Sequence, residues 1–101
     1  MDRILRWYEM PVNIQMLNVE GEILRAIKYK NERNDDNKIN FVIKALEFLS
    51  MVKTDPKHKR HYNELNWMQY ELLDYFIGKN IHQNNDESIL KPYKCWYNYT
   101  Q

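Results

Sequence analysis

The stretch NKINFVIKALEFLSMVK, Asn37–Lys53, is the most continuously apolar part of this chain, and the remaining segments must cover it. With the spacing of an α-helix, its apolar residues occupy an arc wider than half the circumference. The members of this arc are Ile39, Phe41, Val42, Ile43, Ala45, Leu46, Phe48, Leu49 and Val52. Only Asn40, Lys44 and Glu47 form a clear polar stripe. So broad an apolar face is typical of a central helix with neighbours on two sides.

Helical patterns also lie on both sides of this stretch. A short helix precedes Pro11, and a longer one covers about Asn13–Asn31, where apolar residues recur at i, i+3, i+4 and i+7. Another runs from about His61 to Ile77. Two glycines and three prolines are too few for an all-β fold with many tight turns. The sequence predicts an all-α fold, a compact bundle of four main helices in one domain spanning residues 1–101, with room for a short fifth C-terminal helix.

Three details of the helical pattern lead to further expectations. Leu17 and Leu24 form a second apolar stripe on the Asn13–Asn31 helix, and Gly21 between them indicates either a close helix crossing or an extended segment. The polar stretch Lys79–Glu87 predicts a mobile loop. Pro92 is expected to limit the last helix, so that the aromatic tail YKCWYNYTQ docks as a final helical turn or an extended segment.

Charge and cysteine content restrict the class of protein. Fifteen Lys and Arg against fourteen Asp and Glu give a net charge of +1, so no global basic excess favours nucleic acid or membranes. The single cysteine, Cys95, cannot form an intrachain disulfide. No segment approaches the roughly 20 apolar residues of a membrane span, and the N-terminus lacks a signal-peptide pattern. We expect a cytoplasmic protein with no membrane partner.

The outer face of the His61–Ile77 helix carries the strongest candidate site. Opposite its buried stripe lie Trp67, Tyr70, Glu71 and Asp74. A Trp and a Tyr flanked by charges resemble an interaction anchor with a polar rim. We therefore expect a non-enzymatic protein-interaction module, such as a regulator, adaptor or inhibitor, that docks a protein partner or forms a homodimer through this face. The alternative is that another helix or the Trp96-Tyr97-Tyr99 tail covers it.

The basic run Lys53–His61 supports a different function. Lys57, Lys59 and Arg60 cluster at the start of a helix, where positive charge is mildly unfavourable unless an anion binds there. Lys and Arg contacts to phosphates give nucleic-acid affinity without base readout. The alternative function is therefore a nucleic-acid-associated protein that uses this turn. The alternative without a ligand is a solvent-exposed turn whose positive charge is partly offset by Asp55.

An acidic pair gives the weakest alternative, a metal-dependent nucleotide hydrolase. Glu71-Leu72-Leu73-Asp74 resembles the second acidic pair of the all-α nucleotide pyrophosphohydrolases of the MazG kind, and the resemblance would imply a Mg²⁺ site. The Glu-x-x-Glu pair that precedes it in that family is missing here. His58, His61 and Glu64 share a three-residue spacing, but a single such run falls short of a metal site. We expect no catalytic residue, metal or cofactor.

Overall fold

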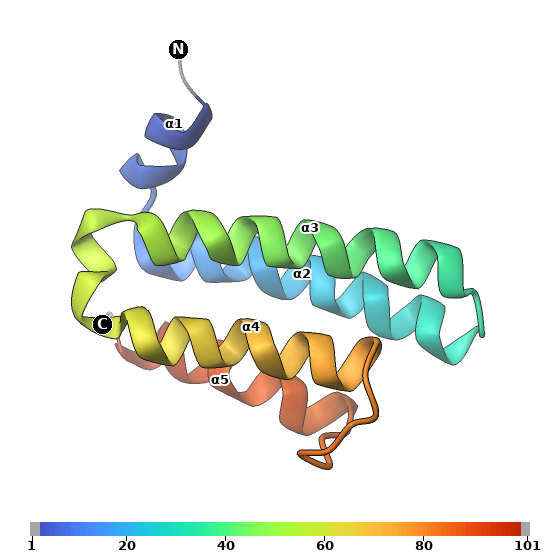
Figure 1. The fold of residues 1–101 in the computed structure, drawn as a ribbon. Helices are drawn as coiled ribbons and strands as arrows, with labels where there is room; N and C mark the ends of the chain where they lie inside the picture. The colour runs from blue at the N-terminus through green and yellow to red at the C-terminus, as the bar shows by residue number, and fades with distance from the viewer. Residues whose placement is uncertain (1–2, 100–101) are drawn as a thin grey trace.

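The computed structural model describes the backbone of residues 3–99 and the side chains of residues 3–96. Within this part of the chain there are five α-helices, one short 3₁₀ segment and no strand (Figure 1). The elements are α1 (Arg3–Glu9), α2 (Val12–Asn31), α3 (Asp35–Thr54), η1 (Pro56–His61), α4 (Tyr62–Phe76) and α5 (Asp86–Tyr99). The prediction of an all-α bundle is confirmed, and the fifth helix is a full-length member of it.

The four long helices form two antiparallel pairs that lie side by side (Figure 1). α2 packs against α3 and α5, while α4 packs against α3 and α5. η1 carries the chain from α3 to α4 at one end of the bundle, and α1 projects beyond the four-helix body near the end of α3 (Figure 1). Each long helix therefore packs against two other long helices. α3 has the two neighbours expected of it, but α2 has as many.

The core lies between the four long helices and takes about four residues from each. Full burial of one such side chain stabilises the fold by roughly 1.5–3 kcal/mol. The buried apolar residues of these helices include Met16, Val19, Ile23, Ala26, Val42, Ala45, Leu49, Val52, Leu65, Met68, Leu72, Phe76, Ile89, Leu90, Tyr93 and Trp96. Outside the four-helix body, α1 contributes Trp7, whose ring stacks on Phe48 of α3 at 5.0 Å.

α3 buries a narrower face than its sequence predicts. Val42 and Leu49 at the centre of the arc are buried, but Ile39 is 38% exposed and Ile43 46% exposed. These two isoleucines lie at the edge of the apolar arc, beyond the part that α2 and α4 cover. The expectation that they are buried is wrong, whereas the predicted polar stripe, including Lys44, does face solvent.

α2 is helical throughout, which confirms the helix and excludes the extended alternative. Leu17 and Leu24 are half exposed, so the second apolar stripe stays outside the core. A Cβ added at Gly21 would meet only the guanidinium of Arg25, at 3.6 Å. The expected close helix crossing at Gly21 is therefore absent.

α5 continues through Pro92, and the expectation that this proline limits the helix is wrong. Proline lacks the N–H that would bond to the carbonyl four residues earlier, which costs helical stability. Tertiary packing offsets this cost, because Ile89 and Tyr93 are 1% exposed and Trp96 is 5% exposed. The side chains of Tyr97 and Tyr99, which the tail prediction included, lie outside the described residues.

Candidate functional site

Three aromatic rings meet on the surface of α4 and the loop that follows it. Trp67 and Tyr70 stack with ring centroids 5.5 Å apart, and the imidazole of His82 packs edge-on against both, at 4.9 and 5.5 Å. Trp67 is 50% exposed and Tyr70 49% exposed. We call Trp67, Tyr70 and His82 the ring surface. The first two were predicted, and both face solvent as expected.

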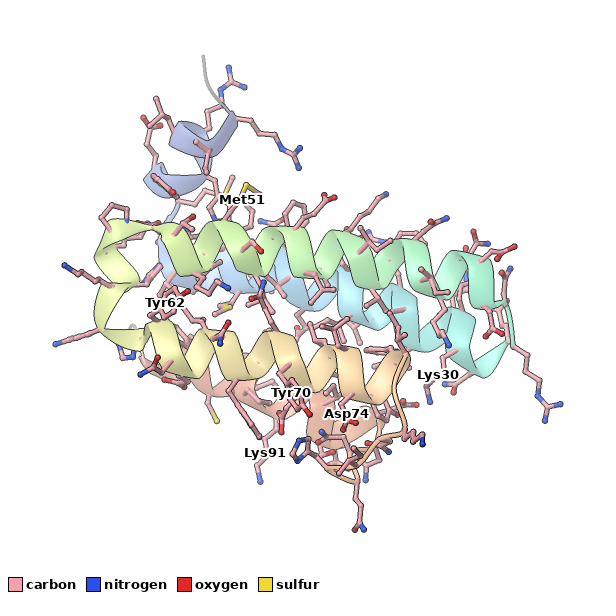
Figure 2. The ribbon with its side chains drawn as sticks, in the orientation of Figure 1. Lys30, Met51, Tyr62, Tyr70, Asp74 and Lys91 are labelled. Atoms are coloured by element: carbon pink, nitrogen blue, oxygen red, sulfur yellow. The ribbon has the colours of Figure 1, made fainter. Side chains whose placement is uncertain are left out.

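Asp74 fixes the loop that brings His82 to this surface. Its carboxylate accepts the N–H of Ile81 at 2.8 Å and the N–H of His82 at 3.0 Å, and its backbone carbonyl accepts the N–H of Asn80 at 3.0 Å. The N–H of His82 has the largest effect and, with that of Ile81, lowers the pKa of Asp74 against the opposing effect of burial. Figure 2 shows Asp74 near Tyr70, on the part of α4 that faces the loop.

The loop itself is closed by reciprocal side-chain bonds. The side chain of Asn80 accepts the N–H of Asn84 at 2.9 Å and donates to its carbonyl at 2.8 Å. Asn80 and Gln83 adopt positive φ angles of 53° and 56°, and such residues are uncommon outside tight turns. These bonds give the central residues of the loop a defined shape, and the mobility expected for Lys79–Glu87 stays a prediction. Sequence reasoning missed His82, and the Asn-rich turn was the only signal for its placement.

The acidic part of the predicted docking face needs correction. Asp74 is only 7% exposed, and Glu71 is half buried. The helical angle alone placed Asp74 beside Trp67 on an open surface, but the loop folds back and covers its carboxylate. Trp96, which was a candidate cover for Trp67, packs instead against His58 and His61 with centroids 5.9 and 5.1 Å apart. Trp96 therefore leaves the ring surface open.

The basic run Lys53–His61 is built around an internal aspartate. Asp55 caps η1 by accepting the N–H of Lys57 at 3.1 Å, and its carboxylate also pairs with the ammonium of Lys57. The same ammonium donates to the backbone carbonyl of Tyr8 at 2.7 Å. Lys57 therefore joins α1 to η1. Its expected role as a phosphate contact is unsupported, because its charge is already paired inside the protein.

A buried amide extends this network into the core. Gln15, fully buried in α2, donates to the carbonyl of Trp7 at 2.8 Å and to Asp55 at 3.0 Å. Its oxygen lies 2.8 Å from Nε2 of His58 and accepts the ring proton there. Burial lowers the pKa of His58 and outweighs the opposing effect of Asp55. His58 is thus an internal hydrogen-bond donor, and no sequence pattern predicts its pairing with Gln15.

The remaining two predicted cations differ from Lys57. Lys59 and Arg60 are exposed, and neither has an ion-pair partner among the described residues. They lie together with Pro56 and Lys57 along an open hollow of about 480 Å³. Of the three cations predicted to contact phosphates, two therefore remain unpaired.

The geometry does not favour the hydrolase alternative. Both carboxylate oxygens of Asp74 accept backbone N–H groups, so this member of the Glu71–Asp74 pair holds a loop. Across the described residues, no three His, Cys, Asp or Glu side chains are arranged to hold a metal ion. Of the two residues that resembled the pyrophosphohydrolases, Asp74 is therefore explained by the structure of the loop.

Comparisons give no family for this chain. No family model, curated protein or solved structure matches it. Over residues 3–99, none of the helices combines the length and apolar character that crossing a membrane requires. The candidate sites therefore rest on the chain's own geometry.

Proposed function

We propose that this protein is a docking module whose partner is another protein, bound through the ring surface of Trp67, Tyr70 and His82. The observation that carries the proposal is the contact between three aromatic rings. Trp67 and Tyr70 are half exposed on α4, and His82 packs against them from the loop that Asp74 holds. Trp and Tyr dominate the energy of protein interfaces, because they bury large areas at a small cost in conformational entropy. Hydrogen bonds that hold the loop in its binding conformation would reduce that cost further.

The charge of α4 favours a partner with a basic rim. Apart from Asp74, which the loop covers, α4 contains Glu64 and Glu71 but no lysine or arginine, although the whole chain has a net charge of +1. Complementary charge around an aromatic anchor speeds association and suppresses wrong partners. The partner we propose therefore presents an apolar pocket for Trp67 with lysine or arginine at its edge.

The same charge argues against a symmetric homodimer through this face. A two-fold axis would place the α4 of one copy against the α4 of the other, so that acidic residues such as Glu64 face a second helix without lysine or arginine. Like charges in contact disfavour an interface by as much as several kcal/mol. A different protein is therefore the better occupant of the ring surface.

A capture experiment with matched variants tests the proposal. The intact chain is immobilised, and proteins retained from extracts of its native cell are compared with those retained by Trp67→Ala and by Leu24→Ala. Leu24, on α2, is 49% exposed and serves as the control. We expect one basic protein whose affinity for purified Trp67→Ala falls at least about 30-fold, the loss typical of a hot spot. Binding to Leu24→Ala should be unchanged.

Two results would contradict the proposal. One is equal retention of every protein by Trp67→Ala and wild type when circular dichroism shows that both are folded. The other is a concentration-dependent dimer in light scattering that Trp67→Ala abolishes, because a second copy would then occupy the ring surface.

A further inference from the structure

A concave site lies at the end of the bundle where the α1–α2 junction, η1 and α5 meet. The hollow has a volume of about 360 Å³. Its apolar side is formed by Pro11, Val12 and Trp96, and its polar side by Lys57, Arg60 and His61. Buried His58 also contributes to the wall. Two walls of opposite chemistry fit a ligand that is itself partly charged and partly apolar.

The charge of this hollow is positive. None of the described residues that line it is acidic. The nearest carboxylates are already paired: Asp55 with Lys57, and Glu64 with His61 at 3.5 Å. Arg60 has no ion-pair partner among the described residues, and it also lines the neighbouring hollow that contains Lys59. The open charge is therefore concentrated on Arg60 and Lys59.

We propose that this site binds a phosphoryl group carried on a small, largely apolar molecule. The guanidinium of Arg60 presents parallel N–H donors that match two phosphate oxygens, and Lys59 adds a second positive charge from the neighbouring hollow. The pairing of Lys57 with Asp55 holds that end of η1 in place, so the wall next to Arg60 is formed before the ligand arrives. Pro11, Val12 and Trp96 provide the contact for the organic part.

The arrangement favours a single phosphoryl group over a nucleic-acid backbone. A duplex presents one charge for about every 1.7 Å of its axis, so proteins that bind it spread many cations along a surface. Here the unpaired cations are two: Arg60 lines this hollow, and Lys59 lines the neighbouring hollow that Arg60 also borders. Nucleic acid is therefore an outcome that the test must distinguish.

The test is a titration of the purified chain with phenyl phosphate, inorganic phosphate and a short single-stranded oligonucleotide. The indole N–H of Trp96 in NMR spectra serves as the reporter. We expect saturable shifts at Trp96, with phenyl phosphate binding more tightly than inorganic phosphate because of the apolar wall. Arg60→Gln should weaken phenyl phosphate binding at least about tenfold, as expected for loss of a charge-assisted bond. Arg60→Lys should lose less.

The matched control is Lys28→Gln, which removes a positive charge about 24 Å along α2 from Val12, at 1.5 Å per residue. It should bind phenyl phosphate as wild type does, and so should Trp67→Ala, because the ring surface is a separate site. The proposal is overturned if Trp96 shows no saturable shift, if Lys28→Gln and Arg60→Gln weaken binding equally, or if inorganic phosphate binds as well as phenyl phosphate. Tighter, strongly salt-dependent binding of the oligonucleotide would overturn it in favour of nucleic acid.

Discussion

Asp55 follows α3, and Asp74 lies in the last turn of α4. Both aspartates are buried, but they hold the chain in different ways. Asp55 bonds to side chains from other elements, the ammonium of Lys57 and the amide of Gln15. Asp74 bonds to backbone N–H groups of the loop seven and eight residues further on. The first aspartate joins α2, η1 and the carboxyl end of α3, whereas the second shapes a single loop.

This difference separates stability from recognition. The Asp55 region is a polar network inside the protein, and its cation Lys57 is used internally. The Asp74 region leaves its neighbours Trp67 and Tyr70 half exposed and adds a third ring to them. We infer that mutations at the Asp55 network change the free energy of unfolding, while mutations at the Asp74 loop change binding.

The largest expected effect comes from Asp55→Ala. This change removes one of two acceptors from the ammonium of Lys57 and from the amide of Gln15, and Gln15 is too deeply buried to replace it with water. Removal of one partner from a buried charged pair costs about 3 kcal/mol, here at the lower end of the range because Lys57 is partly exposed. Urea denaturation should show this loss in the free energy of unfolding.

The control for this prediction is Asp35→Ala, at the start of α3. The side chain of Asp35 is 78% exposed, and its contact with Lys38 is 3.5 Å long. Exposed pairs of this kind contribute about 0–1 kcal/mol. If the two variants lose the same stability, the Asp55 network does not hold the helices together.

The sequence was sufficient to predict α2, α3 and α4, but not the length of α5 or the exposed edges of the helices. The spacing of Val42, Leu49 and their neighbours fixes an apolar face, which must be buried in any helical fold. Whether Ile39 and Ile43 at its edge are covered depends on how far α2 and α4 extend around α3, which no local pattern encodes. Pro92 shows the same limit, because tertiary contacts of the surrounding residues override its helix-breaking tendency.

At the candidate site, the sequence predicts the exposure of a residue only where its position around the helix determines that exposure. Trp67 and Tyr70 share the outer face of α4 by spacing alone, and both are exposed. Asp74 has a similar angle, but a loop from later in the chain covers it and delivers His82. Likewise, the charge of Lys57 is visible in the sequence, whereas its pairing with Asp55 depends on the geometry of the turn.

The pH dependence of stability provides the next test of the comparison. The pKa of His58 is below its ordinary value of 6.5 in the folded protein, so the unfolded chain binds a proton more readily. Stability should therefore fall as the pH drops below 6.5, until the pH passes the folded pKa of His58. Asp55 and Asp74 also have lowered pKa values, because hydrogen bonds outweigh burial. Their stabilisation is present above 3.8 and is lost as the pH falls through their folded pKa values.

Urea denaturation across this pH range should consequently show two decreases in the free energy of unfolding. The upper step lies below pH 6.5 and the lower step below pH 3.8. His58→Gln keeps a side-chain amide that can donate to Gln15 but cannot titrate, so it should remove the upper step only. Asp74→Asn should alter the lower step only. An upper step that persists in His58→Gln would show that protonation elsewhere causes it.

The smallest effect on global stability is expected for Asp74→Ala, although this change should be the most damaging to the ring surface. The N–H groups of Ile81 and His82 lose their acceptor, but water can replace it in an exposed loop, so the free energy of unfolding should fall less than in Asp55→Ala. Hydrogen exchange measured by NMR should show faster exchange at these two amides. The amide of Asn84, which bonds to Asn80 instead, is the control within the same loop and should be affected less. If His82 keeps its ring-current shift from Trp67 in this variant, Asp74 does not position the ring, and the ring surface forms without it.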